Sequence, residues 1–110
     1  MATKVIINPG ACGFPATVVI EKMGGKTFSV AVTSECDMVT KLGSELKELA
    51  LTDVFIRFAD NPVYRKGSVC LRHTACPVLS GILKALEVEA GLNVPKDVSI
   101  TFVKEEKGPS

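Results

Sequence analysis

Hydrophobic and polar residues alternate along much of the first third of the chain, and this pattern is typical of strands with one buried face. A β-branched run at 4–8 leads into Pro9-Gly10 and predicts a strand that a turn ends. Two more β-forming runs, 16–22 and 26–34, are joined by Met23-Gly24-Gly25, which indicates a hairpin. The second run places Phe28, Val30 and Val32 on one face.

The apolar spacing changes to that of a helix after residue 34. Ser34 is the expected N-cap, Glu35 and Asp37 suit a first turn, and Cys36 therefore lies in that first turn. The positions at helical spacing are Met38, Val39, Leu42, Leu46, Leu49 and Ala50.

A second long helix is expected near the end of the chain. Proline is favoured at the first helical position, so Pro77 marks its start and places Cys76 at the cap. The helix should end at Gly91, with Pro95 beyond it. Its expected buried residues are Leu79, Ile82, Leu83, Leu86 and Ala90.

The pattern between these helices is less regular. Residues 53–58 fit either an alternating strand or a short helix, and we favour the helix, capped by Thr52. Its expected buried residues are Val54, Phe55 and Phe58. A further short helix is predicted from Pro62 toward Cys70.

The last apolar pattern alternates again. Val98, Ile100 and Phe102 predict a final strand over 97–103, and the polar residues 104–110 predict a flexible C-terminal tail. Together the elements predict a single α+β domain over residues 1–103. We expect a mostly antiparallel sheet of about four strands with two main helices on one face, and the thiols gathered at one end.

Composition narrows the function. A chain of 110 residues with 46% hydrophobic and 23% charged residues is an ordinary globular domain. A net charge of +1 without a basic cluster argues against nucleic-acid binding. No apolar run approaches the ~20 residues of a spanning helix, and no secretory signal is evident, so a cytoplasmic location without membrane binding is expected. The absence of a glycine-rich phosphate loop argues against a conventional enzyme, although sulfur transfer stays open.

The four cysteines carry the candidate chemistry. In a reducing cytosol, metal binding or thiol chemistry is a better explanation for them than disulfides. Cys12 lies in a Cys-Gly loop, and Cys36 and Cys76 lie at helix starts, where the helix dipole favours a thiolate. His73 and Cys70 complete the run Cys70-x-x-His73-x-x-Cys76.

These residue types match the soft donors of Zn²⁺ or an iron–sulfur cluster. The expected ligands are Cys12, Cys36 and Cys76, with His73 as the fourth and Cys70 as an alternate fourth or a sulfur-accepting neighbour. Asp37 beside Cys36 is a candidate hydrogen-bond acceptor behind the ligands or a stand-in oxygen ligand, but we favour the simpler role of completing the first helical turn.

The order of these donors resembles that of the U-type iron–sulfur cluster assembly scaffolds (the IscU/NifU amino-terminal family). Those proteins have one cysteine in a loop between strands, one where the sheet leads into a helix, and a His-Cys pair at a late helix. The resemblance covers residues 4–91 and implies a two-layer scaffold that works with a cysteine desulfurase and an apo-protein acceptor. Phe14 stands where the family has an aspartate, and His73 and Cys76 are three positions apart instead of adjacent.

Two other hypotheses fit the same residues. Cys76-Pro77 at a helix start is similar to the Cys-Pro motif of small sulfur carriers, in which a single thiolate carries a persulfide. A small interaction domain held together by a structural zinc ion is the third.

Overall fold

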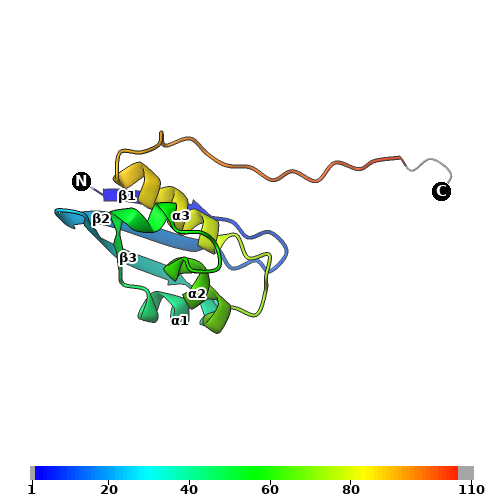
Figure 1. The fold of residues 1–110 in the computed structure, drawn as a ribbon. Coiled ribbons are helices and arrows are strands. Elements are labelled where there is room, and N and C mark those ends of the chain that lie inside the picture. The colour runs from blue at the N-terminus through cyan, green and yellow to red at the C-terminus, as the bar shows by residue number, and fades with distance from the viewer. Residues whose placement is uncertain (1, 107–110) are drawn as a thin grey trace.

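The structure is a computed structural model that describes residues 2–106 (Figure 1). The strands are β1 (Ala2–Ile7), β2 (Ala16–Gly24), β3 (Thr27–Ser34) and β4 (Glu48–Ala50). The helices are α1 (Asp37–Glu45), the short 3₁₀ helix η1 (Leu51–Phe55), α2 (Pro62–Cys70) and α3 (Val78–Glu89).

The four strands form one antiparallel sheet in the order β1-β2-β3-β4. This arrangement confirms the predicted α+β class and the sheet of four antiparallel strands. Three α-helices accompany the sheet: the two main helices expected, α1 and α3, and the short helix predicted from Pro62 toward Cys70, which forms α2.

The hairpin of β2 and β3 provides the centre of the sheet, as its alternating pattern predicts. Its turn is made by Gly24 and Gly25, which have φ values of 151° and 59° that residues with side chains rarely adopt. One face of the hairpin is buried beneath the helices, namely at Ala16, Val18, Ile20, Phe28 and Val30. The helices therefore cover one face of the sheet (Figure 1).

Helix α1 is shorter than its apolar spacing predicts, and that part of the prediction is wrong. The helix ends at Glu45, and residues 48–50 instead form β4 against β3, with Leu49 opposite Phe28. Two buried leucines three positions apart, Leu46 and Leu49, suit a helix, but they equally suit a helix end followed by an edge strand.

The helix predicted over residues 53–58 does form, but as a 3₁₀ helix and at different residues. A 3₁₀ helix forms over Leu51–Phe55, and the Asp53 carboxylate accepts a hydrogen bond from the Ala50 N–H at 2.8 Å. The expected burial is wrong for two residues, since Phe55 is 71% and Phe58 is 75% exposed. Phe58 instead packs edge-on against Tyr64, with ring centroids 5.1 Å apart.

Asn61 holds α2 in place and is itself only 2% exposed. Its Nδ2 donates to the carbonyls of Asp53 (2.7 Å) and Ile56 (3.0 Å), and its Oδ1 accepts from the Val63 N–H (3.0 Å). The side chain therefore caps α2 and ties the preceding segment to it.

Replacing Asn61 by alanine should lower the free energy of unfolding by about 1 to 3 kcal/mol, because it leaves buried backbone groups without partners. Urea denaturation of the variant measures the change. Asn93→Ala, at an exposed position, is the control and should fall within about 0.5 kcal/mol of the parent chain. Equal losses in the two variants would contradict the role given to Asn61.

Helix α3 packs tightly on the outermost strand. A Cβ atom at Gly81 would lie 2.5 Å from Ile7 Cγ1, a separation that real Cβ atoms do not show, so glycine permits this close approach. As expected, α3 ends before Gly91, whose φ is 76°. The contact at Gly81 holds the N-terminal half of α3 against the end of β1.

The strand predicted over 97–103 does not form. Residues 97–106 are extended but pair with no other strand of the described chain, and they run past the body of the domain (Figure 1). A strand requires a hydrogen-bonded neighbour, and the path taken after Gly91 brings this segment to no sheet edge. The predicted tail over 104–110 lies partly outside the described residues, since 107–110 are not described.

None of the helices described over residues 2–106 is both long and apolar enough to cross a membrane.

Candidate functional site

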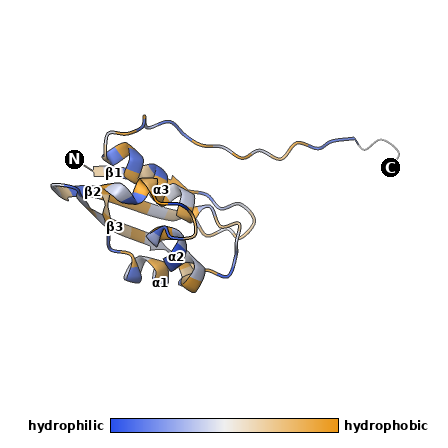
Figure 2. Ribbon diagram, in the orientation of Figure 1, coloured by the Kyte–Doolittle hydropathy of each residue, from blue (hydrophilic) through white to orange (hydrophobic). Residues whose placement is uncertain are grey.

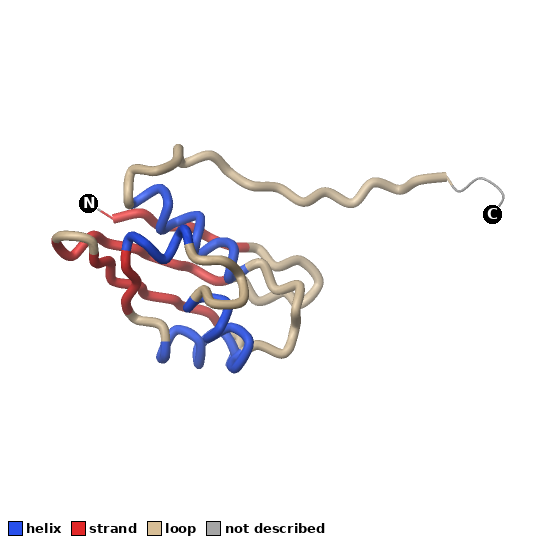
Figure 3. The backbone as a smooth tube through the Cα atoms, viewed as in Figure 1, coloured by secondary structure: helices blue, strands red, loops and turns tan. Residues whose placement is uncertain are grey.

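Three connections meet at one end of the sheet. The register pairs Ile7 with Ala16 and Ala16 with Ser34. The last residue of β1, the first of β2 and the last of β3 therefore lie side by side at this end of the sheet. The contact of Gly81 with Ile7 brings the start of α3 to this end of the sheet as well. Figure 3 shows the β1–β2 and α2–α3 loops together at the right of the molecule.

A small cavity of about 110 Å³ lies among these connections. Four of the five predicted donors line it, one or two from each connection, namely Cys12, Cys36, His73 and Cys76. Its other lining residues are Pro9, Phe14, Met38, Val39, Leu71 and Val78. We call this cavity the thiol pocket, and it gathers donors that are up to 64 positions apart in the sequence, Cys12 and Cys76.

Cys12 lies in a tight turn between two glycines. The Gly13 N–H donates to the Gly10 carbonyl at 3.0 Å, and both glycines have positive φ, 86° for Gly10 and 72° for Gly13. Residues with a side chain rarely adopt that conformation, which explains why glycine occurs on both sides of Ala11-Cys12. The turn leaves Cys12 exposed at the rim of the pocket.

Cys36, and not Ser34, is the N-cap of α1, so the helix begins two residues later than predicted. Its N–H donates to Ser34 Oγ at 3.1 Å, and its carbonyl accepts from the Thr40 N–H at 2.9 Å. Ser34 is the last residue of β3, so its hydroxyl fixes the corner between strand and helix. The thiol of Cys36 is half-buried there.

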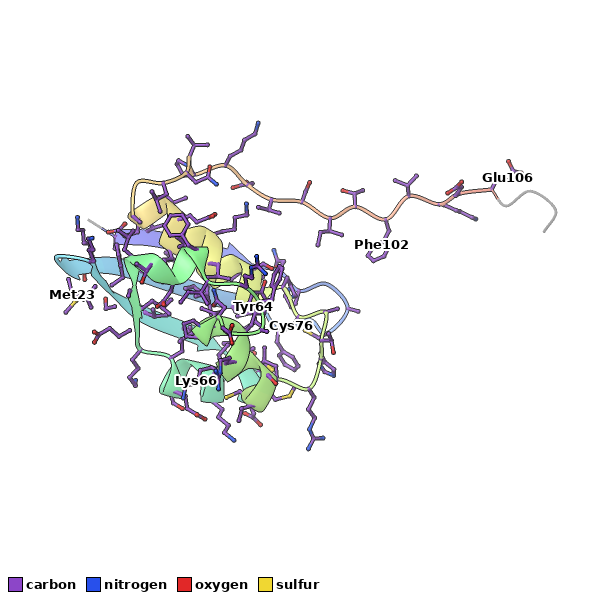
Figure 4. The ribbon with its side chains drawn as sticks, viewed as in Figure 1. Met23, Tyr64, Lys66, Cys76, Phe102 and Glu106 are labelled. Carbon is purple, nitrogen blue, oxygen red and sulfur yellow. The ribbon has the colours of Figure 1, made fainter. Side chains whose placement is uncertain are left out.

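His73 and Cys76 are the two ends of a four-residue turn, closed by the Cys76 N–H donating to the His73 carbonyl at 3.2 Å. A turn of this kind places the Cα atoms of its first and last residues within about 7 Å of each other. Pro77 is the N-cap of α3 and not its first residue, so Cys76 lies one position further out than predicted. Cys76 is half-buried and His73 is exposed (Figure 4 labels Cys76).

Cys70 does not line the thiol pocket. It is the last residue of α2, it is buried, and its Sγ donates to Glu45 Oε2 at 3.5 Å. Burial raises the pKa of this thiol above its ordinary value of 9.0, and Glu45 adds to the effect while Lys41 and Lys66 oppose it. Cys70 therefore belongs to the packing between α1 and α2.

The raised pKa of Cys70 predicts a pH dependence of stability. The thiol ionises at a lower pH in the unfolded chain than in the folded chain. At a pH above the ordinary thiol pKa, unfolding therefore releases a proton, and a rise in pH favours the unfolded chain. The stability that the neutral thiol contributes is complete below about pH 9 and falls as the pH rises through the folded pKa. Urea denaturation between pH 7.5 and 10 should show a steeper loss for the parent chain than for Cys70→Ala. Cys12→Ala, at an exposed position, should keep the parent slope, and an unchanged slope in Cys70→Ala would contradict the assignment.

Asp37 is exposed at the first position of α1, where a carboxylate suits the helix dipole. It does not line the thiol pocket, so its structural role in the first turn accounts for its position.

The types of donor in the pocket favour metal binding, but their arrangement is not that of a preformed metal site. Three thiols and an imidazole are the right types and number for Zn²⁺ or an iron–sulfur cluster. However, within residues 2–106 no three His, Cys, Asp or Glu side chains are grouped as they would be around a bound ion. A metal would require the exposed Cys12 and His73, both on turns, to close over the half-buried Cys36 and Cys76.

Sequence reasoning missed the apolar side chains that complete the pocket. Met38 is one of the residues whose helical spacing predicts the first helix, yet it lines the pocket two positions after Cys36, and its thioether is a soft group. Its position two residues after Cys36 is the one feature of the sequence that could have indicated a place in the pocket. Leu71 and Val78 flank the His73–Cys76 turn, and nothing in their spacing separates them from ordinary core residues.

Comparison with known proteins identifies a family without assigning a function. No curated protein and no solved structure matches the chain. A family model described as "Family of unknown function (DUF6951)" matches residues 3–102, which include all of the sheet except Ala2, the three α-helices and the thiol pocket. The chain therefore belongs to the DUF6951 family of unknown function.

Proposed function

We propose that the thiol pocket binds a thiophilic metal centre, a zinc ion or an iron–sulfur cluster. Cys12, Cys36 and Cys76 are the proposed thiolate ligands and His73 is the proposed fourth. The observation that carries the proposal is that these four donors, from three separate connections, line one cavity.

The surroundings of the pocket support this chemistry. Its remaining lining is apolar, which limits access of water to a metal–thiolate bond. Helices α1 and α3 both begin beside the pocket. The positive end of a helix dipole favours negative charge, such as that of a thiolate, near the helix N-terminus. A thiol must lose its proton to bind a metal, so a helix dipole that favours the thiolate also favours binding.

The resemblance to the U-type assembly scaffolds belongs to the same proposal. It rests on the order of the donors along the chain, and it would make this protein a cytoplasmic, non-enzymatic scaffold that receives sulfur from a cysteine desulfurase and passes a cluster to an apo-protein. Phe14 lines the pocket at the position of the family's aspartate, so this pocket lacks that oxygen donor.

A persulfide carrier is the second candidate, and one observation favours it. A carrier requires only one accessible thiol, and it does not need the preformed group of donors that is absent among residues 2–106. Cys76, half-buried in an apolar pocket beside the start of α3, is the thiol that would carry the sulfur.

Metal analysis of protein purified without oxygen, together with its optical spectrum, tests the proposal. One equivalent of zinc in a colourless protein, or iron and sulfide with thiolate-to-iron absorption, is the expected result. Chelation then separates a structural zinc ion, whose removal unfolds the domain, from a scaffold that stays folded without metal. A metal-free protein that remains folded and gains no metal on anaerobic reconstitution would overturn the proposal in favour of the carrier.

A further inference from the structure

The segment after α3 exposes far more apolar surface than a free segment of a globular protein normally does. Its large apolar residues with their exposed fractions are Leu92 (49%), Val94 (68%), Val98 (65%), Ile100 (82%), Phe102 (97%) and Val103 (81%). Figure 2 shows hydrophobic positions recurring along this segment, and Figure 4 shows Phe102 far from the body. The radius of gyration of 15.2 Å accordingly exceeds the roughly 13 Å of a compact chain of 100 residues.

The pattern of this segment is that of a strand. Val98, Ile100 and Phe102 lie on one face of an extended chain, and Ser99 and Thr101 lie on the other. The backbone over 97–103 is already extended, and it lacks only a hydrogen-bonded neighbour. The family match continues to residue 102, so all but the last residue of the segment 97–103 lies within the region matched by the family model.

The sheet offers a free edge that such a strand would fit. β1 is one of the two edge strands, and its outer side pairs with no strand within residues 2–106, whereas the other edge strand, β4, is only three residues long. Val5 and Ile7 lie half-buried on the face of β1 that the helices cover. An added strand with Ile100 and Phe102 on that face would extend the apolar layer, and its backbone would satisfy the unpaired groups of β1.

The direction of the segment points to another molecule. The chain leaves α3 beside the start of β1, where Glu89 accepts hydrogen bonds from Thr3 Oγ1 (2.7 Å) and the Lys22 N–H (3.2 Å). A tight turn centred on Pro95 then follows, in which the Lys96 N–H donates to the Val94 carbonyl at 2.8 Å. Beyond that turn residues 97–106 run clear of their own sheet (Figure 1) and give the molecule a longest dimension of 58 Å against 30 and 26 Å.

We propose that residues 97–103 add as a strand to the free edge of β1 in a second copy of this chain. The exchange is reciprocal about a twofold axis, so each copy gives one strand and receives one. Strand addition gains its affinity from backbone hydrogen bonds and its specificity from the side chains on alternate positions. The strand predicted from the sequence then forms between molecules.

The experiment combines molar mass with isotope-coded cross-linking of the full chain. Chains grown in ¹⁴N and ¹⁵N media are mixed, unfolded, refolded together and treated with an amine-reactive cross-linker. The exchange predicts a mass in solution of twice 11.7 kDa, and links between Lys4 and Lys96 or Lys104 that join a ¹⁴N peptide to a ¹⁵N peptide. A monomer, or such links only within one isotope, would overturn the proposal, and the latter would place the segment on its own chain.

A pair of variants tests the face assignment. Ile100→Glu puts a charge on the face that should be buried and is expected to weaken dimerisation about ten- to hundredfold. Thr101→Glu, its neighbour on the opposite face, should change the dissociation constant less than threefold. Circular dichroism verifies that both variants remain folded. Equal effects of the two variants, or a dimer unchanged by Ile100→Glu, would contradict the proposal.

Discussion

Replacing Phe28 by alanine is expected to lower the free energy of unfolding by about 3 to 5 kcal/mol. Phe28 is 1% exposed and has the largest side chain among those that are fully buried. It lies on β3 between Lys22 of β2 and Leu49 of β4, beneath the helices. Truncation therefore removes buried apolar contacts and leaves a cavity that the surrounding strands, fixed by their register, can only partly close.

Urea denaturation with an unchanged m-value measures this loss. Phe55→Ala is the matched control, because it removes the same atoms from a side chain that is 71% exposed. The control should change the free energy of unfolding by about 0.5 kcal/mol or less. Similar losses for the two variants would show that Phe28 does not occupy the centre of the core.

Replacing Cys36 by serine is expected to weaken zinc binding about a hundredfold or more. Loss of a residue that only hydrogen-bonds to a metal ligand already costs about 10- to 100-fold in metal affinity, and loss of a thiolate ligand should cost at least as much. This substitution should not disturb the helix, because Cys36 occupies the N-cap of α1 without a capping side-chain hydrogen bond and serine is a preferred residue at that position. The variant should thus keep the fold while losing the donor, and anaerobic competition against a chromophoric chelator measures the affinity.

Cys12→Ser and Cys76→Ser should weaken zinc binding in the same way, since both thiols line the same pocket. Cys70→Ala is the control and should bind zinc as the parent chain does, because Cys70 is buried against Glu45 outside the pocket. If only Cys76→Ser had an effect, and that effect were on persulfide loading, the carrier hypothesis would replace the metal site.

The hairpin and the last helix could be predicted from the sequence because local chemistry determines them. Gly24-Gly25 supplies the backbone conformations of the turn, and Gly91 ends α3 with a positive φ. The end of α1 could not be predicted in this way. Whether Leu49 continues a helix or joins a sheet depends on the free edge of β3 beside Phe28, which is a tertiary property.

The candidate site was predictable in its members and not in its arrangement. Cysteine and histidine types, glycine-flanked turns and helix starts identified Cys12, Cys36, His73 and Cys76 from the sequence. Cys70 shows the limit of that reasoning. Its spacing to His73 suggested a ligand, but the direction of its side chain depends on how α2 packs on α1, and that packing directs it to Glu45.

The most direct measurement is X-ray absorption at the zinc edge of the zinc-loaded full chain, because it counts the atoms bound to the metal. Three sulfur ligands at about 2.3 Å and one nitrogen at about 2.0 to 2.1 Å are expected if the three pocket thiols and His73 bind one ion. A first shell made only of oxygen and nitrogen, or one with a single sulfur, would show that the thiol pocket does not hold the metal.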